Sequence, residues 1–131
     1  MKKCGILNSE ISRVISELGH TDKIVIADAG LPIPVGVKRI DLALKPGVPS
    51  FIETVETVLQ EMCVEAAYVA QEMRTISPER LEELSKAFAG VQTKLISHEE
   101  LKALTHKAKA VIRTGEFTPY ANVVLEAGVV F

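Results

Sequence analysis

Helix-like and strand-like segments alternate along this chain of 131 residues, and that alternation is what most constrains its fold. Residues 9–18 follow the capping residue Asn8, carry apolar side chains at helical spacing and end at Gly19, whereas residues 23–27 form a short apolar run typical of a buried strand. Repeated alternation of this kind is typical of α/β proteins with a largely parallel sheet. Because short connections favour right-handed crossovers, we expect helices on both faces, a three-layer α/β/α sandwich.

Helix-capping residues, helix-breaking glycines and prolines, and apolar runs predict the positions of the other helices and strands. We expect strands at residues 23–27, 39–44, 66–70, 93–96, 110–113 and 123–131, and helices at 9–18, 50–62, 77–88 and 97–106. Ser50 and Ser97 each precede a glutamate by three residues, the spacing of a capping box, and Ser77 precedes a proline suited to the first helical position. The last strand follows its predecessor without a helix, which allows that pair to run antiparallel in a mostly parallel mixed sheet. No repeat or linker divides the chain, so residues 1–131 form a single domain.

Composition narrows the classes of partner. A net charge of −2 offers no electrostatic footprint for nucleic acid or an anionic membrane, and no apolar run approaches the roughly 20 residues of a membrane span. The first residues lack the apolar stretch of a signal peptide, so we expect a cytoplasmic protein with Cys4 and Cys63 as free thiols. The 47% hydrophobic content is high for one small domain, and the surplus fills either a dense core or a subunit interface.

Residues 113–131 combine a polar loop with an apolar end. The loop lies between two apolar runs and carries hydroxyl, amide and charged groups, which suit the binding of hydroxyls on a ligand. Arg113 and Glu116 are placed to form an ion pair that holds this loop. A chain end is normally frayed and polar, so one ending on Phe131 is expected to dock in the core or against another subunit.

Candidate binding residues follow the predicted strands. Asp28 and His98 each come directly after a strand, and Tyr120 and Asn122 lie in the polar loop. Ligands bind beyond the carboxyl ends of strands in such sheets, so we expect these three regions at one edge. His20 precedes a strand and belongs at the opposite edge, unless a neighbouring subunit supplies it. Histidine is the side chain best suited to move protons near neutral pH, which makes His20 the candidate proton carrier.

Each of these residues also has a purely structural interpretation. His20 could close the preceding helix, Asp28 could form a strand-end turn, and His98 could be a solvated first-turn residue. Tyr120 and Asn122 could form a side-chain-stabilised turn with a packed ring. Sequences for dinucleotide or P-loop binding, paired zinc ligands and a nucleophile elbow are absent from the chain. These absences favour a cofactor-free reaction on a small polar substrate.

Several short strings resemble the ribose and fucose mutarotase family. They are Gly5-Ile6-Leu7-Asn8, residues 18–22 (LGHTD), residues 26–32 (IADAGLP), Ser97-His98-Glu99-Glu100 and the segment 113–131. They keep the family's order and spacing from residue 1 to residue 131. The resemblance implies a D-ribose pyranase activity, which interconverts the pyranose and furanose forms and the anomers of D-ribose. The alternatives are an L-fucose-type mutarotase on the same fold and a non-catalytic sugar-binding module.

The resemblance also implies roles for individual residues. His20 matches the family's proton carrier, and the matches for sugar binding are Asp28, His98, Tyr120, Ala121 and Asn122. The resemblance implies that no metal or cofactor is needed. It also implies a decamer of two stacked five-membered rings with sites between adjacent subunits, and a ribose transporter and ribokinase as pathway neighbours. Independently of the resemblance, Lys102 lies one helical turn after His98 and is a candidate hydroxyl donor, while His106 is expected to close that helix.

Overall fold

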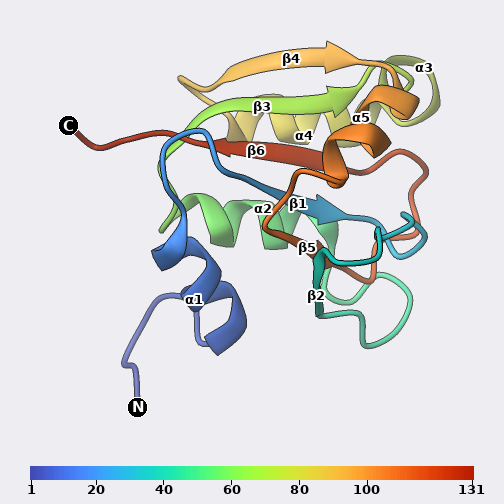
Figure 1. Ribbon diagram of the computed structural model, residues 1–131. Helices are drawn as coiled ribbons and strands as arrows, with labels where there is room; N and C mark the ends of the chain where they lie inside the picture. The colour runs from blue at the N-terminus through green and yellow to red at the C-terminus, as the bar shows by residue number, and fades with distance from the viewer.

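A six-stranded sheet occupies the centre of the computed structural model, which describes all residues 1–131 (Figure 1). The strands, in spatial order, are β2 (Lys38–Asp41), β5 (Ala110–Arg113), β1 (Lys23–Ala27), β6 (Val123–Ala127), β3 (Val64–Ala70) and β4 (Gln92–Ile96). Strand β6 runs antiparallel to both neighbours, and every other pair is parallel. The predicted mostly parallel mixed sheet is confirmed. The antiparallel strand does not pair with β5, however, because β1 and β2 already occupy both edges of β5.

Helices cover both faces of the sheet, as the three-layer prediction requires. They are α1 (Ser9–Glu17), α2 (Phe51–Leu59), α3 (Met73–Ile76), α4 (Pro78–Ala87) and α5 (His98–Thr105). Helices α2 and α4 pack against each other on one face, and α5 contacts β3 and β6 on the other (Figure 1). None of the five helices has the length and apolar character needed to cross a membrane.

Side-chain caps set most helix starts where the sequence predicts them. The Asn8 side chain accepts a hydrogen bond from the amide of Ile11, and Ser97 forms the complete capping box with Glu100. Ser50 accepts from the amide of Glu53, so half of that predicted box is present. Ser77 is the N-cap residue of α4 and Pro78 is its first residue, as predicted, but the Ser77 hydroxyl is buried without a hydrogen-bond partner and makes no capping bond. The short helix α3 was not predicted, since four residues are too few to display a period.

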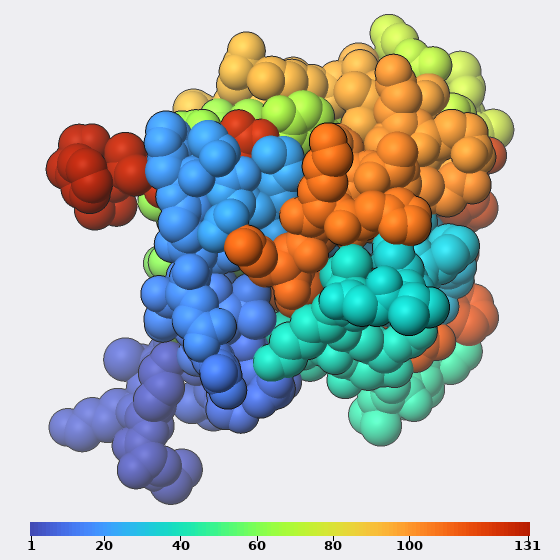
Figure 2. Space-filling view, in the orientation of Figure 1, coloured from blue at the N-terminus to red at the C-terminus, as the bar shows by residue number.

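Two predicted strands end earlier than expected. Strand β2 stops at Asp41, whose carboxylate accepts a hydrogen bond from the amide of Ala43 and turns the chain. Strand β6 stops at Ala127, and Val130 and Phe131 are 87% and 101% exposed. Docking of this tail in the core is therefore wrong; the tail projects from the body beside the segment that leads into β1 (Figure 2). Docking against another subunit stays a prediction.

The centre of the sheet forms the core. Ile24, Val111 and Leu125 are completely buried, because β5, β1 and β6 lie inside the sheet and are covered on both sides. Strands in this position read as continuous apolar runs instead of alternating patterns. This explains why β1 and β5 are recognisable from sequence to the residue.

The turn after β5 has no room for a side chain at Gly115. A Cβ there would lie 2.4 Å from the carbonyl oxygen of Val48 and 2.6 Å from that of Lys45. The amide of Gly115 also donates to the carbonyl of Pro49, so the loop before α2 and the loop after β5 are fastened backbone to backbone. The atoms that a Cβ at Gly115 would meet belong to the backbone, so they cannot move aside as the end of a flexible side chain could.

We predict that Gly115→Ala destabilises the protein by about 1–3 kcal/mol, the usual cost of overpacking. The measurement is the urea unfolding midpoint at fixed protein concentration. Gly30→Ala is the matched control, because its Cβ would meet nothing closer than 3.7 Å and its φ is not positive. Equal midpoints for the two variants would contradict the prediction.

Candidate active site

The direction of β6 brings the predicted binding residues to one edge of the sheet. Strands β1, β3 and β4 end at this edge, and antiparallel β6 begins there. The register pairs Ile26 with Val123, so Asp28 just after β1 lies next to Asn122 just before β6. His98 follows β4 and reaches the same edge. The predicted placement of these regions is confirmed.

Asp28 and Asn122 are joined by two reciprocal hydrogen bonds. The amide of Asp28 donates to Oδ1 of Asn122 at 2.8 Å, and Nδ2 of Asn122 donates to Oδ2 of Asp28 at 2.8 Å. Asn122 is fully buried, so these bonds satisfy an amide that would otherwise be costly to desolvate. The other carboxylate oxygen of Asp28 accepts from the amide of Gly30. Asp28 therefore both stabilises the turn after β1 and offers an acceptor in a fixed orientation. The side-chain-stabilised turn that was the structural alternative for Asn122 is not formed, because its side chain pairs with Asp28.

Tyr120 and His98 meet edge to face. Their ring centroids lie 5.0 Å apart at an interplanar angle of 86°. Tyr120 has a left-handed backbone, with φ of 63°, which costs a non-glycine residue about 1–2 kcal/mol. The amide of His98 donates to both carboxylate oxygens of Glu72 at 3.1 Å, and Nδ1 of His98 is buried without a partner. The solvated interpretation of His98 is therefore wrong.

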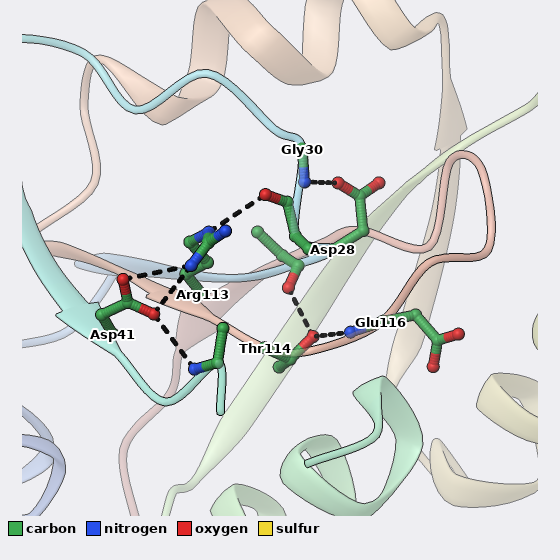
Figure 3. A network of polar contacts seen from close by, with 9 residues as sticks. Asp28, Gly30, Asp41, Arg113, Thr114 and Glu116 are labelled. Atoms are coloured by element: carbon green, nitrogen blue, oxygen red, sulfur yellow. Dashed lines mark hydrogen bonds and ion pairs between the residues drawn. The ribbon is translucent and has the colours of Figure 1, made fainter. Parts of the chain in front are cut away.

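Arg113 holds the loop after β1 in place (Figure 3). Its Nε donates to the carbonyl oxygen of Ala29 at 3.0 Å, and its Nη1 lies 3.2 Å from both carboxylate oxygens of Asp41. The parallel register places Asp41 directly opposite Arg113 on the neighbouring strand. Burial alone would raise the pKa of Asp41, but the amide of Ala43 and the guanidinium outweigh it, so the pKa lies below its usual value. The predicted Arg113–Glu116 ion pair is wrong, since Asp41 takes that place.

Glu116 instead ties the binding loop to helix α2. One carboxylate oxygen accepts from the amide of Phe51 at 3.1 Å, and the other accepts from the amide and the hydroxyl of Thr118. Burial acts to raise the pKa of Glu116, but these hydrogen bonds favour the charged form more strongly, so the pKa is lowered. Between Asp28 and this loop the surface is hollowed into a pocket lined also by Arg113 and Phe117.

The structure places the other predicted residues less centrally. Lys102 forms an ion pair with Glu99 at 2.6 Å and lines a separate surface hollow beside Pro32. No side-chain hydrogen bond joins Lys102 to His98. His106 is the C-cap residue of α5, as predicted. Ala121 is completely buried, so its side chain packs inside the protein and does not face a ligand.

His20 lies at the opposite edge of the sheet, as the sequence predicts for a single subunit. It precedes β1, whereas Asp28 follows the same strand. Its Nε2 lies 2.9 Å from Oε2 of Glu65 on β3, and it does not close helix α1. The neighbouring hollow is lined largely by apolar groups, including Leu18, Met62 and the projecting tail.

Sequence reasoning missed Glu65, Glu72 and Asp41. Glu65 contacts His20, Glu72 contacts His98, and Asp41 contacts Arg113, which holds the loop after β1. The partners in each pair are far apart in the sequence, and the pairing of strands in the sheet brings them together. No local motif marks them. No three His, Cys, Asp or Glu side chains cluster where they could hold a metal ion.

One edge of an α/β sheet thus carries a carboxylate held by a buried amide, together with a phenol and an imidazole, and such groups can bind the hydroxyls of a polyhydroxylated molecule. The chain belongs to the RbsD / FucU transport protein family, whose model matches residues 1–130. It is 55% identical to the D-ribose pyranase of Bacillus subtilis and 56% identical to that of Thermoanaerobacter sp. (strain X514), each over the full length of both chains. The solved structure of Bacillus subtilis RbsD complexed with D-ribose superposes with a TM-score of 0.97, at 55% identity and complete coverage of both chains.

We predict that Asn122→Asp destabilises the protein at pH 7 by about 2–4 kcal/mol, because it sets two carboxylates side by side in place of a hydrogen bond. Part of the loss should return at pH 5, where one carboxyl can take up a proton. Urea unfolding at the two pH values measures both effects. Gln92→Glu, the same chemical change at an exposed strand position, should shift stability by no more than about 0.5 kcal/mol. Wild-type stability of Asn122→Asp at pH 7 would refute the interpretation.

A second prediction concerns Glu116 and pH. Because its folded-state pKa lies below its usual 4.5, ionised Glu116 stabilises the protein above that value, and the contribution is lost as pH falls through the lower folded-state pKa. Glu116→Gln should therefore cost about 1–2 kcal/mol at pH 7 and markedly less near pH 3. Unfolding by urea at both pH values tests this. Glu56→Gln, on an exposed carboxylate of α2, should show no such dependence; a pH-independent cost for Glu116→Gln would contradict the prediction.

Proposed function

We propose that this protein is an isomerase that interconverts the pyranose and furanose forms, and the anomers, of D-ribose. The observation that carries the proposal is its 55% identity over the full length to a D-ribose pyranase, together with the 0.97 TM-score to RbsD complexed with D-ribose. The polar edge around Asp28 and Asn122 supports it from the chemistry of the chain itself. An L-fucose-type mutarotase would need a similar edge, but the relatives at this level of identity carry the ribose name.

The proposed reaction needs only proton transfer. A proton leaves the anomeric hydroxyl, another is delivered to the ring oxygen, and the bond between that oxygen and the anomeric carbon breaks to give the open-chain aldehyde. After rotation about the first carbon–carbon bond, the same hydroxyl attacks the aldehyde carbon to give the other anomer, or a different hydroxyl attacks it to give the other ring size. In both cases the attacking hydroxyl loses its proton and the carbonyl oxygen gains one. No atom changes its redox state. We assign proton transfer to His20 and binding of the sugar hydroxyls to Asp28, His98 and Tyr120, while the buried Asn122 serves binding by holding the Asp28 carboxylate.

A complete site in this proposal requires two subunits. Strand β1 alone separates the level of His20 from that of Asp28 by roughly 13 Å, more than one pentose ring can bridge. We infer that His20 of one subunit meets the binding edge of its neighbour. A contact between two different surfaces closes into a ring under rotation, in line with the proposed decamer of two stacked five-membered rings. The exposed apolar tail beside His20 is suited to such an interface.

The proposed metabolic setting is cytoplasmic. A pyranase would receive ribose from a transporter and supply the furanose form to a ribokinase. Lys102 remains a candidate contact to the sugar from the neighbouring surface hollow, although its ion pair with Glu99 must open for that role.

The deciding experiment is magnetisation transfer by NMR between the pyranose and furanose signals of D-ribose. We expect the protein to accelerate exchange and His20→Ala to reduce that acceleration by about 10²–10⁴-fold, the usual contribution of general acid–base catalysis. His106→Ala is the matched control, because His106 is an exposed histidine at the end of α5 and should leave exchange unchanged.

The alternatives give different outcomes. A non-catalytic sugar-binding module would bind ribose without accelerating exchange, with or without His20. A fucose-type enzyme would accelerate anomer exchange of L-fucose well above any effect on ribose. Either result would overturn the proposal.

A further inference from the structure

Glu65 is the one side chain hydrogen-bonded to the imidazole of His20. Its Oε2 lies 2.9 Å from Nε2, and the two side chains retain 39% and 53% exposure respectively. His20 precedes β1 and Glu65 is the second residue of β3, so 45 positions separate the partners along the chain. The contact therefore depends on how the sheet is assembled and not on a local turn.

The end of β6 fixes the distance between the two residues. The amide of Thr21 donates to the carbonyl of Ala127, and the amide of Ala127 donates back to the carbonyl of Asp22. On the other side, the amide of Gly128 donates to the carbonyl of Cys63. The backbone next to His20 is thus bonded to Ala127, the last residue of β6, and the backbone next to Glu65 is bonded to the adjacent residue, Gly128.

The residue between them is a glycine for a steric reason. A Cβ at Gly128 would lie 3.2 Å from the Cβ of Glu65 and 3.3 Å from the Sγ of Cys63. Both distances are tighter than comfortable packing, so a side chain at this position would press on Glu65. The bare backbone leaves the carboxylate free to face His20.

We propose that Glu65 is a positioning residue that sets the tautomer and the orientation of His20. The inference rests on the proposed function, in which His20 moves the proton. An ionised carboxylate can only accept a hydrogen bond, so the Nε2 atom of His20 must carry the hydrogen. Nδ1 then holds the lone pair and is the atom that takes a proton from the sugar and returns one. When Nδ1 is protonated, the hydrogen bond to Glu65 becomes charge-assisted and strengthens.

The tautomer can be read directly by magic-angle-spinning NMR of the whole protein labelled with ¹⁵N at histidine only. The chain has three histidines, and the spectrum of His20→Ala identifies the signals of His20. We expect His20 at neutral pH to be protonated at Nε2 in the wild type, and less exclusively so in Glu65→Gln, whose side chain can either accept from Nε2 or donate to it. Glu65→Ala should show a mixture of tautomers. A His20 protonated at Nδ1 in the wild type would overturn the proposal.

Kinetics separate positioning from a purely structural role. We expect Glu65→Ala to lower kcat for pyranose–furanose exchange by about 10–100-fold, the effect of losing one hydrogen bond to a charged group, with KM changed less than about twofold. Glu65→Gln should recover part of the rate, because its side-chain oxygen can still accept from Nε2 although the charge is lost. Glu56→Gln is the matched control and should retain full activity.

Each combination of results has a defined meaning. An unchanged tautomer and unchanged kcat in Glu65→Ala would refute the positioning role. If the wild type does not accelerate ribose exchange but the tautomer still depends on Glu65, the proposed function fails while the pairing stands. Loss of activity in Glu65→Ala with an unchanged tautomer would also count against the proposal, since positioning would not be the cause.

Discussion

The binding edge depends on one buried amide. Asn122 is inaccessible to solvent, and both ends of its amide are satisfied by Asp28 alone. Because an unpaired amide in the interior is expensive, Asn122 can be buried only while the half-buried Asp28 pairs with it. That requirement joins the end of β1 to the start of β6, and it holds the Asp28 carboxylate in a fixed orientation before any ligand arrives. Tyr120 lies two residues before Asn122, has a left-handed backbone conformation, and packs its ring against that of His98.

The antiparallel course of β6 gives the sheet two chemically different edges. Its first residues join the polar groups that follow β1, β3 and β4, while its last residues join His20 and Glu65 at the other edge. A strand of five residues therefore separates the proposed hydroxyl-binding edge from His20, the proposed proton carrier, and its partner Glu65. In the proposed ring, neighbouring subunits bring the two edges together. Under this proposal a monomer holds both halves of the site but cannot bring them together.

Much of the fold is predictable from sequence because buried elements have distinctive patterns. The apolar runs of β1 and β5 and the capping box of α5 are local signals, and each is found where expected. The apolar end 128–131 resembles a strand but leaves the sheet, because pairing depends on a neighbour and not on composition alone. Arg113 illustrates the same limit at the site. Its partner Asp41 is set by strand register across 72 positions, which no local pattern encodes, so the nearer Glu116 was the wrong choice. The roles of His20 and Asp28 came from family resemblance, since spacing alone left their structural interpretations open.

The position of β6 also has a consequence for how the polypeptide acquires its structure during synthesis. Residues 123–127 are translated after every other strand, yet they lie between β1 and β3. Until they emerge from the ribosome, the chain can pair β2, β5 and β1 in one group and β3 with β4 in another, with nothing to join the groups through the sheet. The apolar edges of β1 and β3 stay unpaired for that interval and are open to association with other chains. Completion of this domain is therefore a late, long-range event, and the nascent chain is most vulnerable to aggregation just before its last strand appears.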